Sequence, residues 1–320
     1  MLMARGVGHL TLLVALVLGS GVAQAAGYDF ASINYPGTAS SQTDAFGINA
    51  NGLVVGTYYD ANGIPTGTYS YDSKRATYRL IAAAPGLANQ HLTGVNRNGA
   101  MVGFANSTTT FLVALIRNPL GTYTSIIHSG AVDTEFRGIN DGGSATGFYR
   151  TTLQGGGIAF LYNNSGTVTD LVPGLLTPLS CIAQGINTVG QIVGHAYLPP
   201  GGAYPGSPLR EYGWMRRTSG TYQLFDVNQQ RTFGRGINDS AVMVGFTIDG
   251  FGTPHGFFTT LMSPADYQSI TLSADQILDF PGAVMTFPQA INNDGVIVGN
   301  WVDAAGAGHG FIATPTSPTR

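Results

Sequence analysis

Charge is scarce in this sequence. Only 10% of its 320 residues are charged, whereas about 25% is usual for soluble domains. Lys74 is the only lysine, Glu135 and Glu211 are the only glutamates, and the formal net charge is −3. Binding to nucleic acid or to an anionic membrane surface needs a basic patch. The sequence therefore predicts no nucleic-acid partner.

Cysteine is nearly absent as well. The single residue, Cys181, excludes an intramolecular disulfide framework. A secreted chain without disulfides must be held together by a large core, and the 43% of hydrophobic residues argues against disorder. Because no basic side chain is evident near Cys181 in the sequence, we expect a buried, inert thiol and not a nucleophile.

A hydrophobic run near the N-terminus, Leu10–Val22, is too short to span a membrane as a helix, which takes about 20 residues. Arg5 precedes this run, and Ala23-Gln24-Ala25 supplies a small-x-small cleavage pattern. Residues 1–25 are therefore predicted to be a signal peptide. A retained membrane anchor is the alternative. We expect no transmembrane anchor, and a protein secreted to the medium or the periplasm.

Glycine is abundant, with 46 residues, and much of it belongs to one recurring phrase. The phrase reads GINANGLVVG at 47–56 and AINNDGVIVG at 290–299. Its asparagine occurs six times, at Asn49, Asn96, Asn140, Asn187, Asn238 and Asn292. A glycine follows seven residues later in every copy, at Gly56, Gly103, Gly147, Gly194, Gly245 and Gly299. The distance from asparagine to glycine is constant, whereas the distance from one asparagine to the next varies between copies. This combination predicts a rigid hairpin in each copy and variable loops between the hairpins.

Each copy has the features of an antiparallel hairpin. The asparagine is expected to form an Asx turn, in which Gly52 of the first copy adopts a positive φ. The glycine seven residues later is expected at a bulge or at a close approach between sheets. A third strand follows every hairpin, and a fourth follows five of them, the fifth copy's lying at 276–282. Four short strands in each repeat of this length are typical of a β-propeller blade.

The sixth copy has no fourth strand after it. Residues 28–40 resemble residues 276–286, because each segment reads as a strand that ends in Pro-Gly before a motif. We therefore predict an all-β, six-bladed β-propeller over residues 26–320, a single domain. In this prediction the N-terminal strand completes the last blade, three strands plus one, and removes the free edges. A β-solenoid and a pair of β-sandwiches are the alternatives.

The pattern PG…T…INNDGVIVGNWVDAAGAGHGF, together with GIAFLY in the third copy, resembles the bacterial extracellular HAF-repeat family. The resemblance covers nearly all of residues 26–320 and is closest in copies 1, 5 and 6. It implies a secreted bacterial repeat protein with a propeller-like fold, in a family without an established general activity. Some members carry a C-terminal apolar helix and a basic tail. This sequence ends in TPTSPTR, so we expect release and not anchoring.

The residue before the glycine, or its equivalent, in each motif varies between copies. These six residues are Phe46, Thr93, Arg137, Gln184, Arg235 and Gln289. If the motif strands are innermost, these side chains are expected to ring the channel mouth. We place that mouth on the face formed by the loops that enter the motif strands. Arginine and glutamine there suit carboxylates or sugar hydroxyls. The alternative is that they only bond neighbouring blades.

Glu135 and His91 are further candidate ligand contacts, assigned to variable loops. Asp133 and Glu135 lie two residues apart and form a candidate carboxylate pair for a hydrolase; the alternative is that they are solvated loop acids. His255 and His309 recur in HGF phrases but fall a blade apart, so we expect them to be structural. The sequence predicts no metal site and no cofactor.

These observations favour a monomeric, non-catalytic binding module that presents variable loops on a propeller face to a glycan, a surface polymer or an extracellular protein. The sequence has no nucleophile elbow, phosphate-binding loop or zinc-binding HExxH motif. The alternative is a secreted propeller hydrolase or lyase that acts on polysaccharide. It would use loop acids, or Arg137 and Arg235 near the channel. A fold alone does not decide between these functions.

Overall fold

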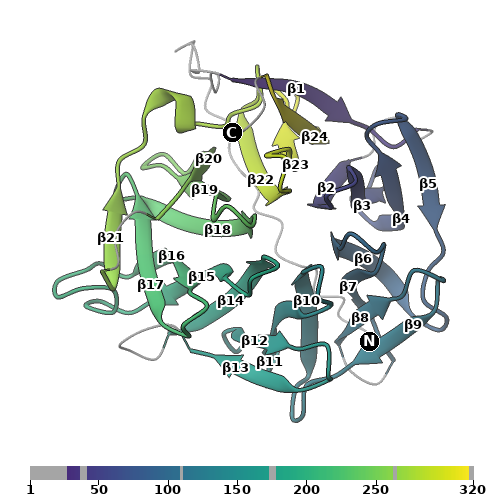
Figure 1. Ribbon diagram of the computed structural model, residues 1–320, viewed down its shortest axis with the longest axis horizontal. Helices are drawn as coiled ribbons and strands as arrows, with labels where there is room; N and C mark the ends of the chain where they lie inside the picture. Colours follow the sequence, from purple (N-terminus) through teal and green to yellow (C-terminus); the bar gives the residue numbers. More distant parts are fainter. Residues whose placement is uncertain (1–26, 37–41, 109–110, 173–177, 262–264, 317–320) are drawn as a thin grey trace.

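The computed structural model describes residues 27–36, 42–108, 111–172, 178–261 and 265–316. The predicted signal peptide, residues 1–25, lies outside these ranges. The described residues form an all-β fold, with strands β1 to β24 and one short 3-10 helix, η1 (Ala274–Gln276). Figure 1 shows the strands gathered in groups around a central axis, which is a β-propeller arrangement. No helix within these ranges has the length and apolar character that a membrane crossing requires.

The first three repeats each contribute four antiparallel strands in chain order. The first has β2 (Thr43–Ile48), β3 (Leu53–Tyr59), β4 (Pro65–Asp72) and β5 (Thr77–Ile81). The second has β6 (Ala88–Val95), β7 (Met101–Asn106), β8 (Leu112–Arg117) and β9 (Tyr123–Ile126). The third has β10 (Asp133–Ile139), β11 (Ala145–Arg150), β12 (Ile158–Tyr162) and β13 (Val168–Leu171). The parallel pair Asp133↔Leu112 joins the second group to the third.

The fourth and fifth repeats depart from this pattern. The fourth has β14 (Ser180–Ile186), β15 (Ile192–Leu198), β16 (Arg210–Arg216) and β17 (Tyr222–Val227). Within the described residues the fifth has three strands, β18 (Arg231–Ile237), β19 (Met243–Ile248) and β20 (Pro254–Thr259). The next strand, β21 (Tyr267–Ile270), pairs in parallel with β17 of the preceding repeat.

The prediction of a strand at 276–282 is wrong. This segment makes one bridge, Phe257↔Ile277, and then a turn. Beyond the bridge, the Asp279 carboxylate takes the place of a backbone partner, because it accepts a hydrogen bond from the Gly256 N–H at 2.8 Å. A side-chain acceptor satisfies the edge of β20 at this point without a ladder.

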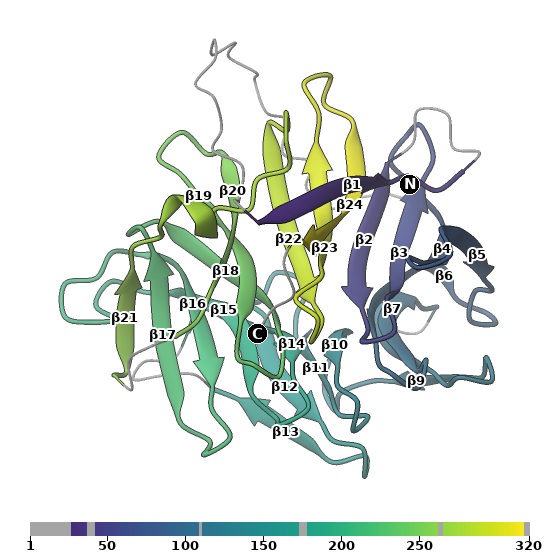
Figure 2. The same cartoon turned by 45° about the horizontal axis from the view of Figure 1, so that its top comes forward.

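The sixth repeat has β22 (Met285–Ile291), β23 (Ile297–Val302) and β24 (Gly308–Pro315). Strand β1 (Tyr28–Ile33) pairs antiparallel with β24, in a register that runs from Tyr28↔Pro315 to Ile33↔Gly310. Figure 2 shows β1 lying across β24, beside the group that begins with β2. One sheet therefore contains segments from both ends of the described chain.

The core lies between successive sheets. One cluster joins Ala159 of the third repeat to Cys181 and Trp214 of the fourth. Another joins Ile33 and Val298 of the sixth repeat's sheet to Tyr69 of the first and its neighbours. Burial raises the pKa of the Cys181 thiol, so the expectation of a buried, unreactive cysteine is confirmed.

The hairpin turns form as expected. In the first copy the side-chain oxygen of Asn49, Oδ1, accepts hydrogen bonds from the backbone N–H groups of Asn51 and Leu53, at 2.9 and 3.0 Å. Gly52 has a φ of 82°, which a residue with a side chain rarely adopts. In the fifth copy Ala241 occupies the equivalent position with a φ of 59°. The asparagine therefore holds the turn even where the glycine is missing.

Candidate functional site

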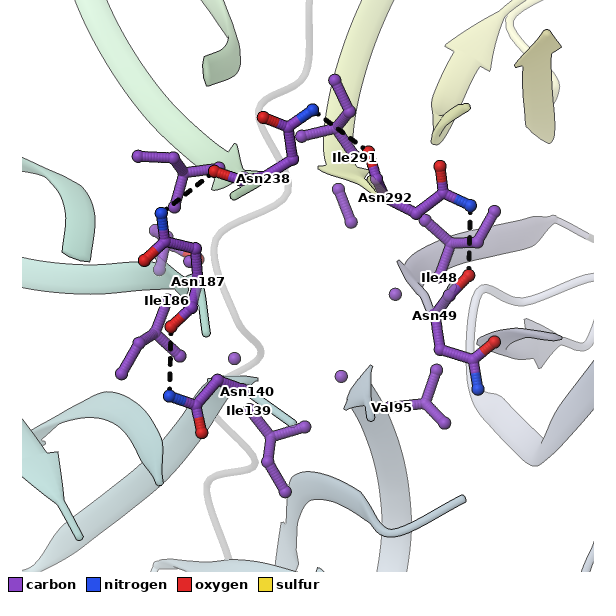
Figure 3. A pocket seen from close by; sticks show the side chains of 18 of the residues that line it. Ile48, Asn49, Val95, Ile139, Asn140, Ile186, Asn187, Asn238, Ile291 and Asn292 are labelled. Carbon is purple, nitrogen blue, oxygen red and sulfur yellow. Dashed lines mark hydrogen bonds between the residues drawn. The ribbon is translucent and has the colours of Figure 1, made fainter. Parts of the chain in front are cut away.

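The six motif asparagines form a closed ring at one end of the channel. Each side-chain amide donates a hydrogen bond to the backbone carbonyl of the next asparagine around the ring, as Figure 3 shows for several of them. Asn292 closes the ring by donating to the Asn49 carbonyl at 3.1 Å. The same side chain thus folds its own turn and links two repeats. Sequence reasoning found the first role and missed the second.

A β-bulge precedes the motif in every repeat. In each hairpin the register of the first strand shifts at the residue before the motif. These bulged residues are Phe46, Thr93, Arg137, Gln184, Arg235 and Gln289, the same six that the sequence singled out. The second hairpin has a further shift between Ala88 and His91. A bulge leaves its extra residue unpaired and re-aims its side chain.

The glycine seven residues after each asparagine makes the bulge possible. A Cβ atom at Gly147 would overlap with the Glu135 carbonyl oxygen on the bulged strand, and one at Gly56 would overlap with that of Asp44. The other four copies have the same arrangement. The expectation of a bulge at this glycine is confirmed, with the extra residue on the opposite strand.

The bulged side chains line a cavity on the central axis. They alone enclose a space of about 180 Å³. A second space of about 110 Å³ continues from them to the asparagine turns. The smaller space extends to the turns that follow the first strands, whereas the sequence placed the mouth at the loops that enter these strands.

Between the bulged residues and the asparagines, the backbones of the first strands of neighbouring repeats pack closely against one another. A Cβ at Gly47 would lie 2.8 Å from the Gly94 Cα, and one at Gly185 would lie 2.9 Å from the Gly236 Cα. The sixth repeat has Ala290 at this position, and its Cα lies 2.8 Å from a Cβ built at Gly236. The glycine of the GIN phrase therefore allows the backbones of neighbouring repeats to approach closely.

Arg137 is held on the cavity wall by its neighbours. Its guanidinium donates to the Glu135 carboxylate and stacks over the rings of Phe104 and Phe148, at 5.0 and 5.3 Å from their centroids. Arg150 lies 4.0 Å from the same carboxylate. The charge of Arg137 is therefore compensated within the protein.

Arg235 has a different environment. Its guanidinium lies 5.1 Å above the centroid of Phe246, and within the described ranges it makes no ion pair and no hydrogen bond through its side chain. Burial, reinforced by the positive charge of Arg137, lowers the pKa of Arg235 to about 9. The two arginines of the ring are thus chemically distinct.

The other four bulged residues complete a ring that is polar in repeats 3 to 6 and less polar in repeats 1 and 2. Gln184 and Gln289 flank Arg235 in repeat order, and their side-chain amides bond to no other described residue. The Thr93 hydroxyl is already engaged in hydrogen bonds within the protein, because it donates to the carbonyl oxygens of Val102 and Phe136 at 3.3 and 2.9 Å. Phe46 adds an aromatic ring. Four planar polar groups therefore follow one another from repeat 3 to repeat 6.

His91 and Glu135 are on strands, which contradicts their assignment to loops. His91 lies on β6 and stacks on Phe104 with a centroid distance of 4.7 Å. Burial, with the charge of Arg137, lowers the pKa of His91 to about 4. Both residues stand two positions before a bulged residue of the same strand.

The interpretation of Asp133 and Glu135 as solvated loop acids is wrong. Asp133 is 1% exposed and Glu135 is 4% exposed, both on β10. Asp133 accepts a charged hydrogen bond from Arg150, as Glu135 does from Arg137. Burial raises the pKa of both carboxyls against the opposing effect of these arginines. They sit in an ion-paired cluster beneath the cavity wall.

The recurrent histidines bond to neighbouring segments. His255 contacts the Asp279 carboxylate at 2.8 Å through Nδ1, and His309 contacts the Asn34 side chain at 3.1 Å and Asp303 at 3.2 Å. The hydrogen bond to Asp279 raises the pKa of His255. Among the described residues, no group of three or more His, Cys, Asp or Glu side chains is arranged to hold a metal ion.

Comparisons with known proteins concern the fold. No protein-family model matches this chain, and no curated protein matches it. Among solved structures, the chain is similar to a putative gluconolactonase, with 13% identity and a TM-score of 0.46 over 91% of this chain and 93% of that one. It is also similar to an Aleuria aurantia lectin crystallised with Fucα1-6GlcNAc, with 11% identity and a TM-score of 0.48 over 88% and 97%.

A third similar structure is the β-propeller domain of the Trilobed protease from Pyrococcus furiosus. The identity is 9% and the TM-score 0.43, over 86% of this chain and 98% of that one. At such low identities and TM-scores, these similarities carry no information about what this chain binds or catalyses.

Proposed function

We propose that the protein is a secreted, non-catalytic binding module, a six-bladed propeller closed by β1, that receives its ligand in the central channel. The pairing of β1 with β24 and the bond from Asn292 to Asn49 support this closure. The signal-peptide pattern and the resemblance to HAF repeats support secretion. A terminal group of a glycan, a surface polymer or an extracellular protein would enter the channel.

The identity of the bulged residues is the observation that carries this proposal. The asparagine ring, the bulge and the glycine opposite it are the same in all six repeats. The fold therefore demands the bulge but not a particular side chain on it. The six side chains nevertheless differ, and Gln184, Arg235 and Gln289 direct unused polar groups into a cavity. A cavity with a few convergent polar groups is typical of a binding site.

The binding proposal is tested with a glycan and protein array probed with the mature chain. We expect signals that the double variant Gln184→Leu/Gln289→Leu removes. Arg79→Gln, an exposed change on β5, should leave them unchanged. Signals that survive the double variant would place binding outside the channel, and an array without any signal would contradict the proposal.

One observation favours the second candidate, a hydrolase or lyase acting on polysaccharide. The carboxyl of Glu135 adjoins Arg137 on the cavity wall, and burial raises its pKa; a raised carboxyl pKa favours general-acid catalysis. Release of reducing ends or of unsaturated products from a polysaccharide panel, abolished by Glu135→Gln, would establish this function. Its absence would leave binding alone.

A further inference from the structure

Arg235 is the uncompensated charge of the cavity wall. The wall carries two arginines, and Arg137 is neutralised by Glu135. At the mouth, the Asp141 carboxylate pairs with Arg97 at 3.3 Å, and that of Asp239 accepts hydrogen bonds from the Thr188 N–H and the Asn293 amide at 2.8 and 2.7 Å. No described carboxylate lies within ion-pair distance of Arg235.

The surroundings of Arg235 make this charge costly. Its Nε is buried without a partner, and one face of the guanidinium is covered by Phe246. The neighbouring His195 supplies no negative charge, and burial together with the charges of Arg235 and Arg137 lowers its pKa. A buried charge is ordinarily paired. An unpaired one facing a cavity indicates a partner that comes from outside the chain.

We infer that the channel binds the anionic group of a ligand, a carboxylate or another oxyanion, on Arg235, with Gln184 and Gln289 binding the ligand's adjacent polar atoms. This inference rests on the proposed function and names its ligand chemistry. Arginine presents two parallel N–H donors, which match the two oxygens of such a group. The flanking glutamine amides supply further donors and acceptors for hydroxyls.

The size of the cavity limits the group that enters. An apolar cavity of about 150 Å³ holds benzene, a molecule of six heavy atoms. By the same measure, the space of about 180 Å³ among the bulged side chains holds about seven heavy atoms. It therefore fits a small organic acid such as malonate, or the carboxylate-bearing edge of an acidic sugar whose ring stays outside this space. Phe46 follows Gln289 in repeat order and lies two repeats from Arg235. It offers an apolar surface to one side of such a group.

Thermal unfolding in the presence of anions tests the inference. The purified chain is heated with sodium galacturonate, malonate or phosphate at about 10 mM, or with galactose as the uncharged counterpart, since a ligand of the native state raises Tm. We expect at least one anion, and not galactose, to raise the Tm of the wild type. The shift should vanish in Arg235→Gln and persist in the surface control Arg79→Gln.

Calorimetry then measures the affinity for the anion, and a comparison of free and polymeric anions shows which of the two the channel prefers. Loss of a charge-assisted hydrogen bond predicts an affinity for the active anion about 10- to 100-fold weaker in Arg235→Gln. Tighter binding of oligogalacturonate than of galacturonate would assign the anion to a polymer, and the reverse to a free acid. If no anion shifts the Tm, or if the shift persists in Arg235→Gln, the inference is overturned. Galactose binding that Gln184→Leu/Gln289→Leu abolishes would overturn it while leaving the proposed binding function intact.

Discussion

Replacement of Asn292 by alanine tests the ring of asparagines at the point where it closes. The Asn292 side chain is 6% exposed and makes three hydrogen bonds. It donates to the Asn49 carbonyl at 3.1 Å and accepts from the N–H groups of Asp294 and Val296, at 3.0 and 2.9 Å. At about 1 kcal/mol net for each bond, Asn292→Ala should cost about 3 kcal/mol of unfolding free energy.

Asn163→Ala provides the matched control. Asn163 forms the same kind of turn, because its side chain accepts from the N–H groups of Ser165 and Thr167 at 3.1 and 2.8 Å. It makes no side-chain hydrogen bond to another repeat among the described residues and is more exposed than Asn292, so water replaces part of what is lost. We expect a cost of about 1 kcal/mol for this variant. The difference between the two variants reports the bond between repeats.

Urea denaturation followed by circular dichroism measures both costs. For a chain of this size the Asn292→Ala penalty corresponds to a decrease in Tm of roughly 5–10 °C. Asn292→Asp refines the result, because the carboxylate keeps both turn acceptors and loses only the donor to Asn49. If Asn292→Ala is no more destabilising than Asn163→Ala, the ring of bonds does not contribute to stability, and the argument for closure loses this support.

Three other changes address the packing and the buried charges. Gly138→Ala should destabilise by about 1–3 kcal/mol, because its Cβ would overlap with the Gln184 carbonyl oxygen, whereas Gly250→Ala, with open space around it, should be neutral by urea denaturation. Ile33→Ala removes a side chain of β1 that is 1% exposed and should cost about 2–4 kcal/mol; a loss below 0.5 kcal/mol would mean that β1 is not part of the cooperative fold. The folded pKa of His91, about 4, lies below the usual value of about 6.5, so its contribution to stability is complete above pH 6.5 and is lost as the pH falls toward 4. His91→Phe should therefore remove up to about 3 kcal/mol of the fall in stability between these pH values, and identical pH profiles for the two proteins would refute the assignment.

The parts of the fold that repeat could be predicted from the sequence. Six copies of one phrase act as an internal alignment, so Asn49 and its equivalents located the turns, and Gly56 and its equivalents located the bulges. The segment at 276–282 could not be placed in this way, because it follows an insertion that occurs only once. β21 pairs in parallel with β17, and its Tyr267 and Ser269 hydroxyls donate to the Asp226 carboxylate at 2.6 and 2.7 Å. This contact belongs to one pair of strands and follows no repeated pattern, so the sequence does not reveal it.

The candidate site was predictable in its position but not in its electrostatics. The residue before the GIN glycine, or its equivalent, was identified because it varies where its neighbours do not. Whether its charge is compensated depends on residues brought close by folding. Arg137 is paired through Glu135 on its own strand, which the spacing of two residues could have suggested. Arg235 is unpaired because repeats 4, 5 and 6, which surround it, place no described carboxylate near it. Only the structure shows which residues these repeats bring close to Arg235.

The pairing of β1 with β24 has a consequence for the order of events during synthesis. Residues 28–33 leave the ribosome long before their partner strand, residues 308–315. Until that strand is made, β1 has no partner, and the ends of a very long loop remain to be joined, which costs entropy. Earlier repeats can stack as they emerge, so ring assembly should end in one slow step that joins the two ends. A chain halted before residue 308 would keep an open sheet edge, and such edges favour aggregation.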